Sequence, residues 1–346
     1  MALEVKHDTV IENADKWDAY VDASAQGNLY HSSKFLKNLE DSFGYQGVFI
    51  WAEEDGEIVG VLPLMSVPSL MSKSPRLIGL PVSTCSGAIG RSAEAVQSML
   101  DLGGELTKDL NAKYLELRQQ AQAGSTLITK DSYVTFIYNL EHGSDGLWDA
   151  LNRKTRGSIR KAEKSGLEIE VDSSDLSTFY NLYIRRLRDL GSPPYPLSFF
   201  RKLMEEFGDG VKISLVKKDD RIIASCFSII YKDTIHAMLA GADRRHLSLN
   251  PYSLMYWKII EYAAAQGVKY FDFGRSRLGT GSYDFKKNWG FPSTQLYYQY
   301  YLGTAQEHPQ LESGSIWTRT FQNMWRLLPL SVVAWLGPKI RKYIVA

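Results

Sequence analysis

The chain has few of the residues on which several common kinds of active site depend. Only two cysteines occur, Cys85 and Cys226, and no spacing of cysteine or histidine resembles a set of metal ligands. We therefore expect no metal site and two buried thiols in a reducing compartment. The six histidines lie outside the basic segment 270–291, so no histidine base or triad is expected there. His236, on an apolar strand, is interpreted as a packed histidine.

Long apolar runs and an excess of one charge are also missing. The formal net charge is +1, so no global field draws the protein to nucleic acid or acidic lipid. No apolar run approaches the roughly 20 residues of a spanning helix, and the sequence starts without a secretory signal. We expect a cytoplasmic globular protein, most simply a monomer. Residues 327–337 are interpreted as a docked C-terminal helix, and Leu327–Lys342 lying on the inner face of the membrane is the alternative.

What the chain does contain is a repeated pattern. Residues 49–65 and 213–229 align without gaps, at an offset of 164, as strand, charged turn and strand. Asp55 falls on Asp219 in this alignment, and each turn lies between β-branched runs, which is typical of a hairpin. The two segments therefore predict two copies of one unit.

A second correspondence follows in the same order along the chain. Residues 113–117 resemble residues 269–273, and each stretch follows a segment with helical periodicity. Hairpin, helix and strand, found twice, predict an α/β (α+β) fold made of two duplicated domains. The expected segments are an N-terminal domain at 1–146, a C-terminal domain at 147–303 and a helical tail at 304–346.

The start of the second copy is marked by a basic helix. Residues 147–164 place apolar side chains at spacings of three and four and should form one helix with an inward stripe. Its opposite side carries several cations, including Arg156 and Arg160. These are either a solvated face on a linking helix or contacts to phosphates.

The segment 270–291 is the strongest candidate for a functional site. A short alternating strand ends at Gly274 and leads into a flexible loop that carries Arg275 and Lys286. Cations delivered at the end of a strand suit an anion or a developing negative charge. A surface turn with solvated cations is the alternative, but the aromatic neighbours Phe285 and Trp289 argue against a wholly solvated Lys286.

Two further positions are candidates for ligand contacts. Arg188 ends a basic helical turn before Gly191 and a proline-rich loop, and arginine suits a bidentate clamp on phosphate or carboxylate. A salt-bridged surface arginine is the equally weighted alternative. Asn250, followed by Pro251, makes a favourable helix start whose dipole favours an anion.

With these features, the chain resembles the FemAB family, peptidyltransferases built from two tandem acetyltransferase-like (GNAT) domains. The resemblance spans roughly residues 10–303 and is best at 156–166, 188–193 and 271–290. It looks most like the branch that accompanies exosortase and exopolysaccharide gene clusters. Residues 29–39 match the family pattern only loosely, and the long helical arm of some members has no counterpart.

The resemblance implies transfer of an acyl group, often aminoacyl from aminoacyl-tRNA, onto an amine of a cell-envelope precursor. The family's Phe-Lys pair falls on Phe285 and Lys286, so Lys286 is expected to stabilise the charge that develops during transfer. Asp272 would accept a proton or hold Arg275, and Arg275 would orient an anionic group. The substrate-binding residues expected in addition are Phe285, Tyr283, Arg188, Asn250, Arg156 and Arg160.

The acyl donor is left between aminoacyl-tRNA and acyl-CoA, and no permanently bound cofactor is expected. The loop after the strand 234–242 contains no glycine before Pro251, which disfavours close wrapping of the coenzyme A pyrophosphate. The acceptor would be a nucleotide- or lipid-linked sugar or peptide. Two alternatives stay open: a CoA-dependent N-acyltransferase acting on an amino-sugar nucleotide, and a non-catalytic binding module of envelope assembly.

Overall fold

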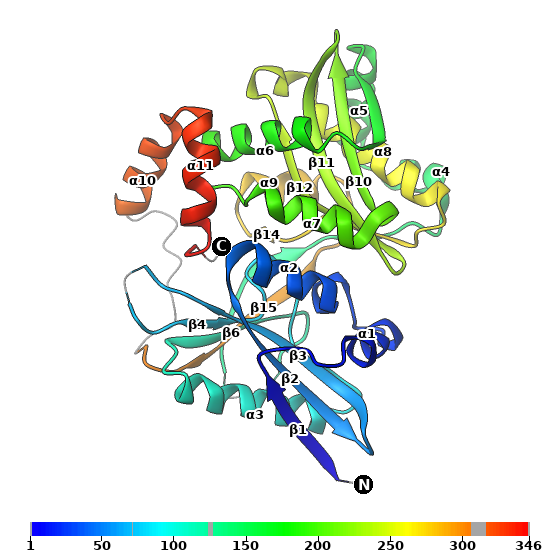
Figure 1. Cartoon of the computed structure of the whole chain (residues 1–346). Helices are drawn as coiled ribbons and strands as arrows, with labels where there is room; N and C mark the ends of the chain where they lie inside the picture. Colours follow the sequence, from blue (N-terminus) through cyan, green and yellow to red (C-terminus); the bar gives the residue numbers. More distant parts are fainter. Residues whose placement is uncertain (1, 71, 124–126, 306–315, 345–346) are drawn as a thin grey trace. The chain divides into compact units, whose positions relative to one another are not determined.

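The computed structural model describes residues 2–70, 72–123, 127–305 and 316–344, which form two compact units (Figure 1). The first unit comprises residues 1–133, 295–311 and 340–346, and the second comprises residues 134–294 and 312–339. Each unit is a mixed sheet flanked by helices, so the predicted α/β class is confirmed.

The units differ from the predicted segments in two places, because strand pairing overrides sequence order. Strand β8 (Ile137–Asn139), expected at the end of the first domain, pairs with β13 (Tyr270–Asp272) in the second unit. Strand β15 (Thr294–Leu302), expected in the second domain, pairs antiparallel with β6 (Tyr114–Gln119) in the first. The tail is likewise divided between the units, at residues 339 and 340.

The first unit holds its sheet in the order β1-β2-β3-β4-β6-β15-β7, with β5 beside β3. The pair β4–β6 is parallel. Helix α3 packs on β1, β2, β3 and β6. The other elements of this unit are β1 (Leu3–Asp8), α1 (Ala14–Ala23), α2 (Ser33–Phe43), β2 (Gln46–Glu54), β3 (Glu57–Val67), β4 (Arg76–Ile78), β5 (Ile89–Gly90), α3 (Ala93–Asp109) and β7 (Ile128–Thr135).

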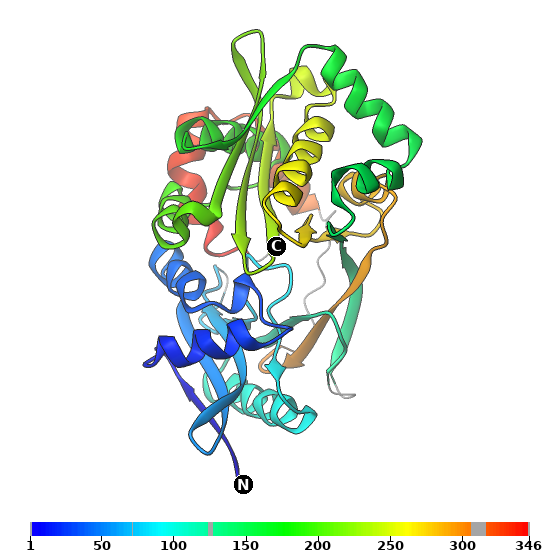
Figure 2. The ribbon, with the colours of Figure 1, turned by 90° about the vertical axis from the view of Figure 1, so that its right-hand side faces the viewer.

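The second unit has the strand order β8-β13-β12-β11-β10-β9. Its further elements are α4 (Gly143–Ala150), α5 (Arg153–Lys164), β9 (Glu168–Ser173), α6 (Leu176–Leu190), α7 (Leu197–Phe207), β10 (Val211–Lys218), β11 (Arg221–Tyr231), β12 (Thr234–Ala242), α8 (Pro251–Ala265), β14 (Ser276–Arg277), α9 (Gly281–Lys287), α10 (Ile316–Arg326) and α11 (Leu330–Arg341). Within this unit, α5 and α8 lie next to each other (Figure 2).

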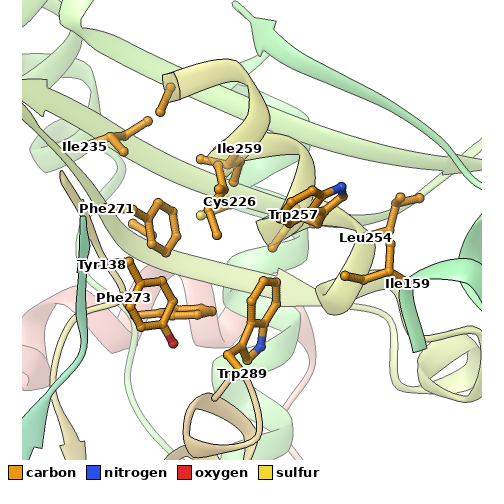
Figure 3. Packing of buried hydrophobic residues seen from close by; sticks show 14 of the residues in the cluster. Tyr138, Ile159, Cys226, Ile235, Leu254, Trp257, Ile259, Phe271, Phe273 and Trp289 are labelled. Carbon is orange, nitrogen blue, oxygen red and sulfur yellow. The ribbon is translucent and has the colours of Figure 1, made fainter. Parts of the chain in front are cut away.

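Helices cover both faces of the second sheet. Phe227 packs against Phe179 of α6 and Phe200 of α7. The adjacent Cys226 points the other way, into the cluster that contains Trp257 and Ile259 of α8 (Figure 3). Alternation along β11 therefore places α6 and α7 on one face and α8 on the other. Cys226 is fully buried as expected, whereas Cys85 is only half-buried.

The two predicted hairpins are present, and their hydrogen-bonded registers repeat in the same way. Each hairpin has a two-residue turn with positive φ at both positions, Asp55-Gly56 and Asp219-Asp220. The β2–β3 register shifts between Ala52 and Glu53, and the β10–β11 register shifts at the same aligned place, 164 residues later. Turn and bulge together fix which side chains of each hairpin face the core. The helix and strand that follow each hairpin, α3–β6 and α8–β13, are also found.

The single helix expected at 147–164 is two helices. Helix α4 ends before Leu151, whose backbone is extended, and α5 starts after Asn152. The Asn152 side chain accepts a hydrogen bond from Thr155 N at 2.9 Å, which caps a new helix instead of continuing the old one. The inward stripe itself is confirmed, because Leu151, Thr155 and Ile159 are buried.

The C-terminal helices dock on the second unit, as the sequence predicted. Trp325 and Val333 are buried, while Leu327 is 85% and Trp335 is 64% exposed. Helix α10 lies against α6. Among the described residues, no helix has both the length and the apolar content needed to cross a membrane.

Candidate functional site

The candidate site lies where the parallel strands β12 and β13 stop pairing. Their register ends with His236 opposite Asp272. The chain then turns at Gly274, whose φ of 70° is readily adopted only by glycine. The crevice beyond the carboxyl ends of parallel strands is where open α/β sheets bind ligands. Both His236 and Asp272 are buried, at 5% and 4% exposure.

Asp272 is held by three groups of the second unit. It accepts hydrogen bonds from Thr135 Oγ1 at 3.1 Å and from Gly274 N at 2.8 Å, and its Oδ2 lies 3.1 Å from His236 Nδ1. Burial acts to raise the pKa of Asp272, but the hydrogen bond and charge of His236, with Gly274 N and Lys286, lower it overall. The carboxylate is therefore ionised at neutral pH.

His236 is packed, as predicted, but its pairing with Asp272 was missed. Thr135 was missed as well. A parallel pairing of these strands follows from the strand–helix–strand order of β12, α8 and β13. The register that sets His236 opposite Asp272 depends on tertiary packing. The sequence could therefore predict that the two strands pair, but not which of their residues lie opposite each other.

Lys286 lies on a short helix and not in the flexible loop that the glycines suggested. Thr280 Oγ1 accepts a hydrogen bond from Tyr283 N and so caps α9. The Lys286 side chain runs back toward β13, and only 8% of the residue is exposed. Its Nζ donates hydrogen bonds to Gly274 O at 2.8 Å and Arg275 O at 3.1 Å.

The pKa of Lys286 is lowered to about 8, mainly by burial and to a smaller extent by the charge of Arg275, while the charge of Asp272 opposes the shift. The ammonium form still predominates at pH 7. An ammonium group has three N–H donors, and two of them are used by the backbone carbonyls. Within the described residues, the third N–H has no acceptor.

Lys286 lies beside an aromatic cluster that includes Phe273 and Trp289, and Figure 3 shows these two rings. Lys286 Nζ lies 5.6 Å from the centre of the Phe273 ring. Phe273 in turn packs edge-on against Trp289 at 5.3 Å and Tyr256 at 4.5 Å. These apolar neighbours exclude water on one side of the ammonium, which is why its charge is costly and why its electrostatic effect is strong.

The remaining expected residues have other surroundings. Phe285 is half-buried against Trp289, and Tyr283 packs near Phe136. Arg275 is half-buried beside the site, and the carbonyl of its own peptide receives Lys286. Asn250 adopts a left-handed conformation before α8, and its side chain makes no cap hydrogen bond.

The three basic candidates are held by local contacts. Arg188 donates to Asp189 at 3.2 Å, which fits the salt-bridged alternative, although its Nε has no partner among the described residues. Arg156 donates to the carbonyl oxygen of Asp149, and Arg160 stacks over Trp148. In the described part of the chain none of the three contacts Lys286, so their roles stay predictions.

In the first unit, the position that corresponds to Asp272 is also a buried carboxylate, and it pairs with a buried arginine. The parallel pair β4–β6 sets Ile78 opposite Glu116, the residue that the sequence repeat aligns with Asp272. Glu116 binds Arg118 at 2.9 Å, and both are buried, Arg118 to 1% exposure. Arg118 also donates to the carbonyl oxygens of Pro81 and Ser83. This buried pair has the form of a structural element, and its cation comes from the same strand as its carboxylate.

With this geometry in view, comparisons with known proteins give a consistent picture. Residues 150–287 match the family described as acetyltransferase (GNAT) domain. The chain has a tandem GNAT-like fold. No curated protein sequence matches the chain.

Solved structures agree with the GNAT assignment. The crystal structure of FemX is 16% identical with a TM-score of 0.68, covering 87% of this chain and 98% of its own. A tandem GNAT protein from the clavulanic acid biosynthesis pathway is 10% identical with a TM-score of 0.55, covering 86% and 98%. The C-terminal domain of a putative lysylphosphatidylglycerol synthetase from Agrobacterium fabrum is 12% identical with a TM-score of 0.54, covering 84% and 92%. The predicted resemblance to the FemAB family is thus confirmed at the level of fold.

No group of three or more potential metal ligands occurs among the described residues.

Proposed function

We propose that the protein is an N-acyltransferase whose second GNAT unit forms an amide bond beside Lys286. The observation that carries this proposal is the buried Lys286 ammonium, which donates to Gly274 O and Arg275 O and has a third N–H without an acceptor in the described part of the chain. The match of residues 150–287 to the acetyltransferase (GNAT) domain supports the same reaction class.

In the proposed reaction, the nitrogen of an acceptor amine attacks the carbonyl carbon of an activated ester. The carbonyl π electrons move to oxygen, and the free N–H of Lys286 binds the oxyanion. A preorganised donor of this kind contributes about 3–4 kcal/mol to transition-state stabilisation. When the intermediate collapses, the C–O bond breaks, the amine loses its proton to the leaving oxygen, and an amide and an alcohol result.

The donor is proposed to be aminoacyl-tRNA, and the acceptor an amine on a nucleotide- or lipid-linked envelope precursor in the cytoplasm. Similarity in fold to FemX and to a putative lysylphosphatidylglycerol synthetase supports an aminoacyl donor. The glycine-free loop before Pro251 disfavours coenzyme A. Acyl-CoA transfer to an amino-sugar nucleotide is the competing version of the same chemistry.

The test compares Lys286→Met with Lys287→Met, an exposed lysine on the same helix. Charged tRNA or acetyl-CoA is incubated with UDP-glucosamine as the amine acceptor, and loss of the ester or thioester above that of a protein-free blank is measured. Lys286→Met should lower the rate at least 100-fold, with Lys287→Met within twofold of wild type. Equal rates for wild type and Lys286→Met would overturn the proposal, and the donor that is consumed separates the two versions.

A second property is favoured by the exposed residues of the C-terminal helices. Leu327 and Trp335 expose large apolar surfaces, and Lys339 Nζ lies 3.8 Å from the centre of the Trp335 ring. Apolar side chains flanked by lysines are typical of contact with an anionic membrane surface. Sedimentation with phosphatidylglycerol vesicles should pellet the wild type but not Leu327→Ser/Trp335→Ser. Failure of the wild type to pellet would remove this property.

A further inference from the structure

A cavity of about 370 Å³ lies in the second unit, at the far end of β12 from His236. Helix α6, the start of β11 and the loop after β12 form its walls. Three arginines line it, Arg185 from α6, Arg221 from β11 and Arg245 from the loop. This volume lies within the range of small-molecule sites.

One polar atom of the cavity wall lacks a hydrogen-bond partner. Arg185 Nε is buried and makes no hydrogen bond within the described residues, whereas His246 Nδ1 lies 3.9 Å from Asp243 Oδ2. A buried donor without an acceptor costs free energy, so Arg185 Nε is available to an oxygen atom of a ligand.

The cavity keeps an unneutralised positive charge. Asp243, its one acidic wall residue, binds Arg245 through Nε at 3.1 Å and through a terminal nitrogen at 2.5 Å. That hydrogen bond lowers the pKa of Asp243 to about 2, so the pair is fixed as a neutral unit. Arg185 and Arg221 have no carboxylate partner among the described residues, which leaves two free guanidinium groups at the cavity.

We propose that this cavity binds a phosphate ester of nucleotide size. Two guanidinium groups with the Asn181 amide offer more donors than the two oxygens of a carboxylate can accept. The charged non-bridging oxygens of a phosphate ester match this set. The apolar wall formed by Leu182 and Ile223 would contact the organic part of the ligand. Binding by side chains also explains how phosphate is held where no glycine-rich loop exists.

The position of the cavity specifies the shape of the substrate, and this step rests on the proposed function. His236 and Asp243 are seven residues apart along β12 and the residue that follows it, roughly 23 Å at about 3.3 Å per residue. A substrate anchored here and reacting beside Lys286 must therefore be extended, as the 3′ end of a charged tRNA, coenzyme A and a nucleotide-linked acceptor all are.

The test is isothermal titration of the full-length protein with a 5′-phosphorylated CCA trinucleotide, coenzyme A and UDP-N-acetylglucosamine. At least one probe should bind at a single site, and Arg185→Ala and Arg221→Ala should each weaken it at least tenfold. Arg201→Ala, an exposed arginine on α7, is the matched control and should stay within twofold. The probe that binds identifies the source of the phosphate.

Three outcomes would overturn the proposal. These are no saturable binding of any probe, equal affinity for wild type and Arg185→Ala, and displacement of the probe by succinate as effectively as by inorganic phosphate. Titrations are repeated with Lys286→Met, which should bind the probe as the wild type does. Loss of binding in the arginine variants together with full transfer activity in Lys286→Met would retain the cavity and reject the proposed function.

Discussion

The proposed reaction depends on the charge of the Lys286 side chain. Its pKa of about 8 lies below the ordinary value of 10.5 because burial disfavours the charged form. The protonated form is needed to stabilise an oxyanion, so the charge must persist at the working pH. The neighbouring carboxylate of Asp272 favours this charge.

The rate of transfer should fall as the pH rises through about 8, because Lys286 then loses its proton. A pH–rate profile between 6 and 10 measures this limb, and Lys286→Met should show a low rate without it. The stability of wild type relative to Lys286→Met should rise between pH 8 and 10.5, because the unfolded chain binds the extra proton in that window. A wild-type rate that is flat across pH 8 would contradict the role of Lys286.

Asp272→Asn should move the alkaline limb to a lower pH. Removing the carboxylate takes away the charge that raises the pKa of Lys286, while burial remains. The expected result is a reduced rate at pH 7.5 that recovers partly at pH 6. Asp284→Asn, an exposed carboxylate on α9, should leave the profile unchanged. An identical shift in both variants would show that general surface charge, not this contact, is responsible.

At the residue scale, the aromatic neighbours Phe285 and Trp289 indicated that Lys286 is not wholly solvated, and the residue is in fact buried. It did not predict the acceptors Gly274 O and Arg275 O, because backbone carbonyls carry no sequence signal. The His236–Asp272 pair was missed because it links strands separated by a whole helix.

At the element scale, the local sequence predicted the hairpin turns and one helix end correctly. It failed where a capping residue competed with an apolar stripe or with flexible glycines. The hairpin turns at Asp55 and Asp219 and the helix end at Gly191 follow from local chemistry, and all three are found. The apolar stripe of 147–164 indicated one helix, and the cap at Asn152 divided it. Likewise, Gly279 and Gly281 suggested a flexible loop, but the cap at Thr280 produced α9.

Two glycine-to-alanine changes should have opposite effects on stability. Gly56 has φ of 81° in a hairpin turn, where alanine is strained, so Gly56→Ala should destabilise by about 1 kcal/mol. Gly157 lies in helix α5 with open space where a Cβ would stand, so Gly157→Ala should stabilise by about 0.5–1 kcal/mol. Thermal melting of both variants measures the difference. Shifts of the same sign would contradict this view of the two backbones.

At the scale of the whole molecule, the two copies of the duplicated unit differ at the aligned acidic position, where Glu116 pairs with a buried arginine and Asp272 pairs with His236. Arg118→Met should therefore destabilise the protein by about 3–5 kcal/mol, because it leaves Glu116 buried without its cation. The double change Glu116→Gln/Arg118→Met should be less harmful, since it leaves no unpaired charge. Urea denaturation measures both. A midpoint for Arg118→Met equal to that of wild type would show that the pair is dispensable.

The duplication itself could be predicted from sequence, since the hairpins repeat at a fixed offset. The exchange of β15 could not, because the preference of a strand for one sheet edge over another depends on partners distant in sequence. Its pairing with β6 is set by residues about 180 positions away, such as Tyr300 opposite Glu116.

The return of β15 to the first unit has a practical consequence. The chain passes between the units four times, so neither unit is a continuous stretch that a gene fragment could encode. A fragment that ends at Tyr133 lacks β15, so one edge of β6 would have no partner strand. Such an unpaired edge promotes aggregation. A protease that cuts one connection would leave the two units joined by the other connections. The two units must therefore be expressed together as one chain.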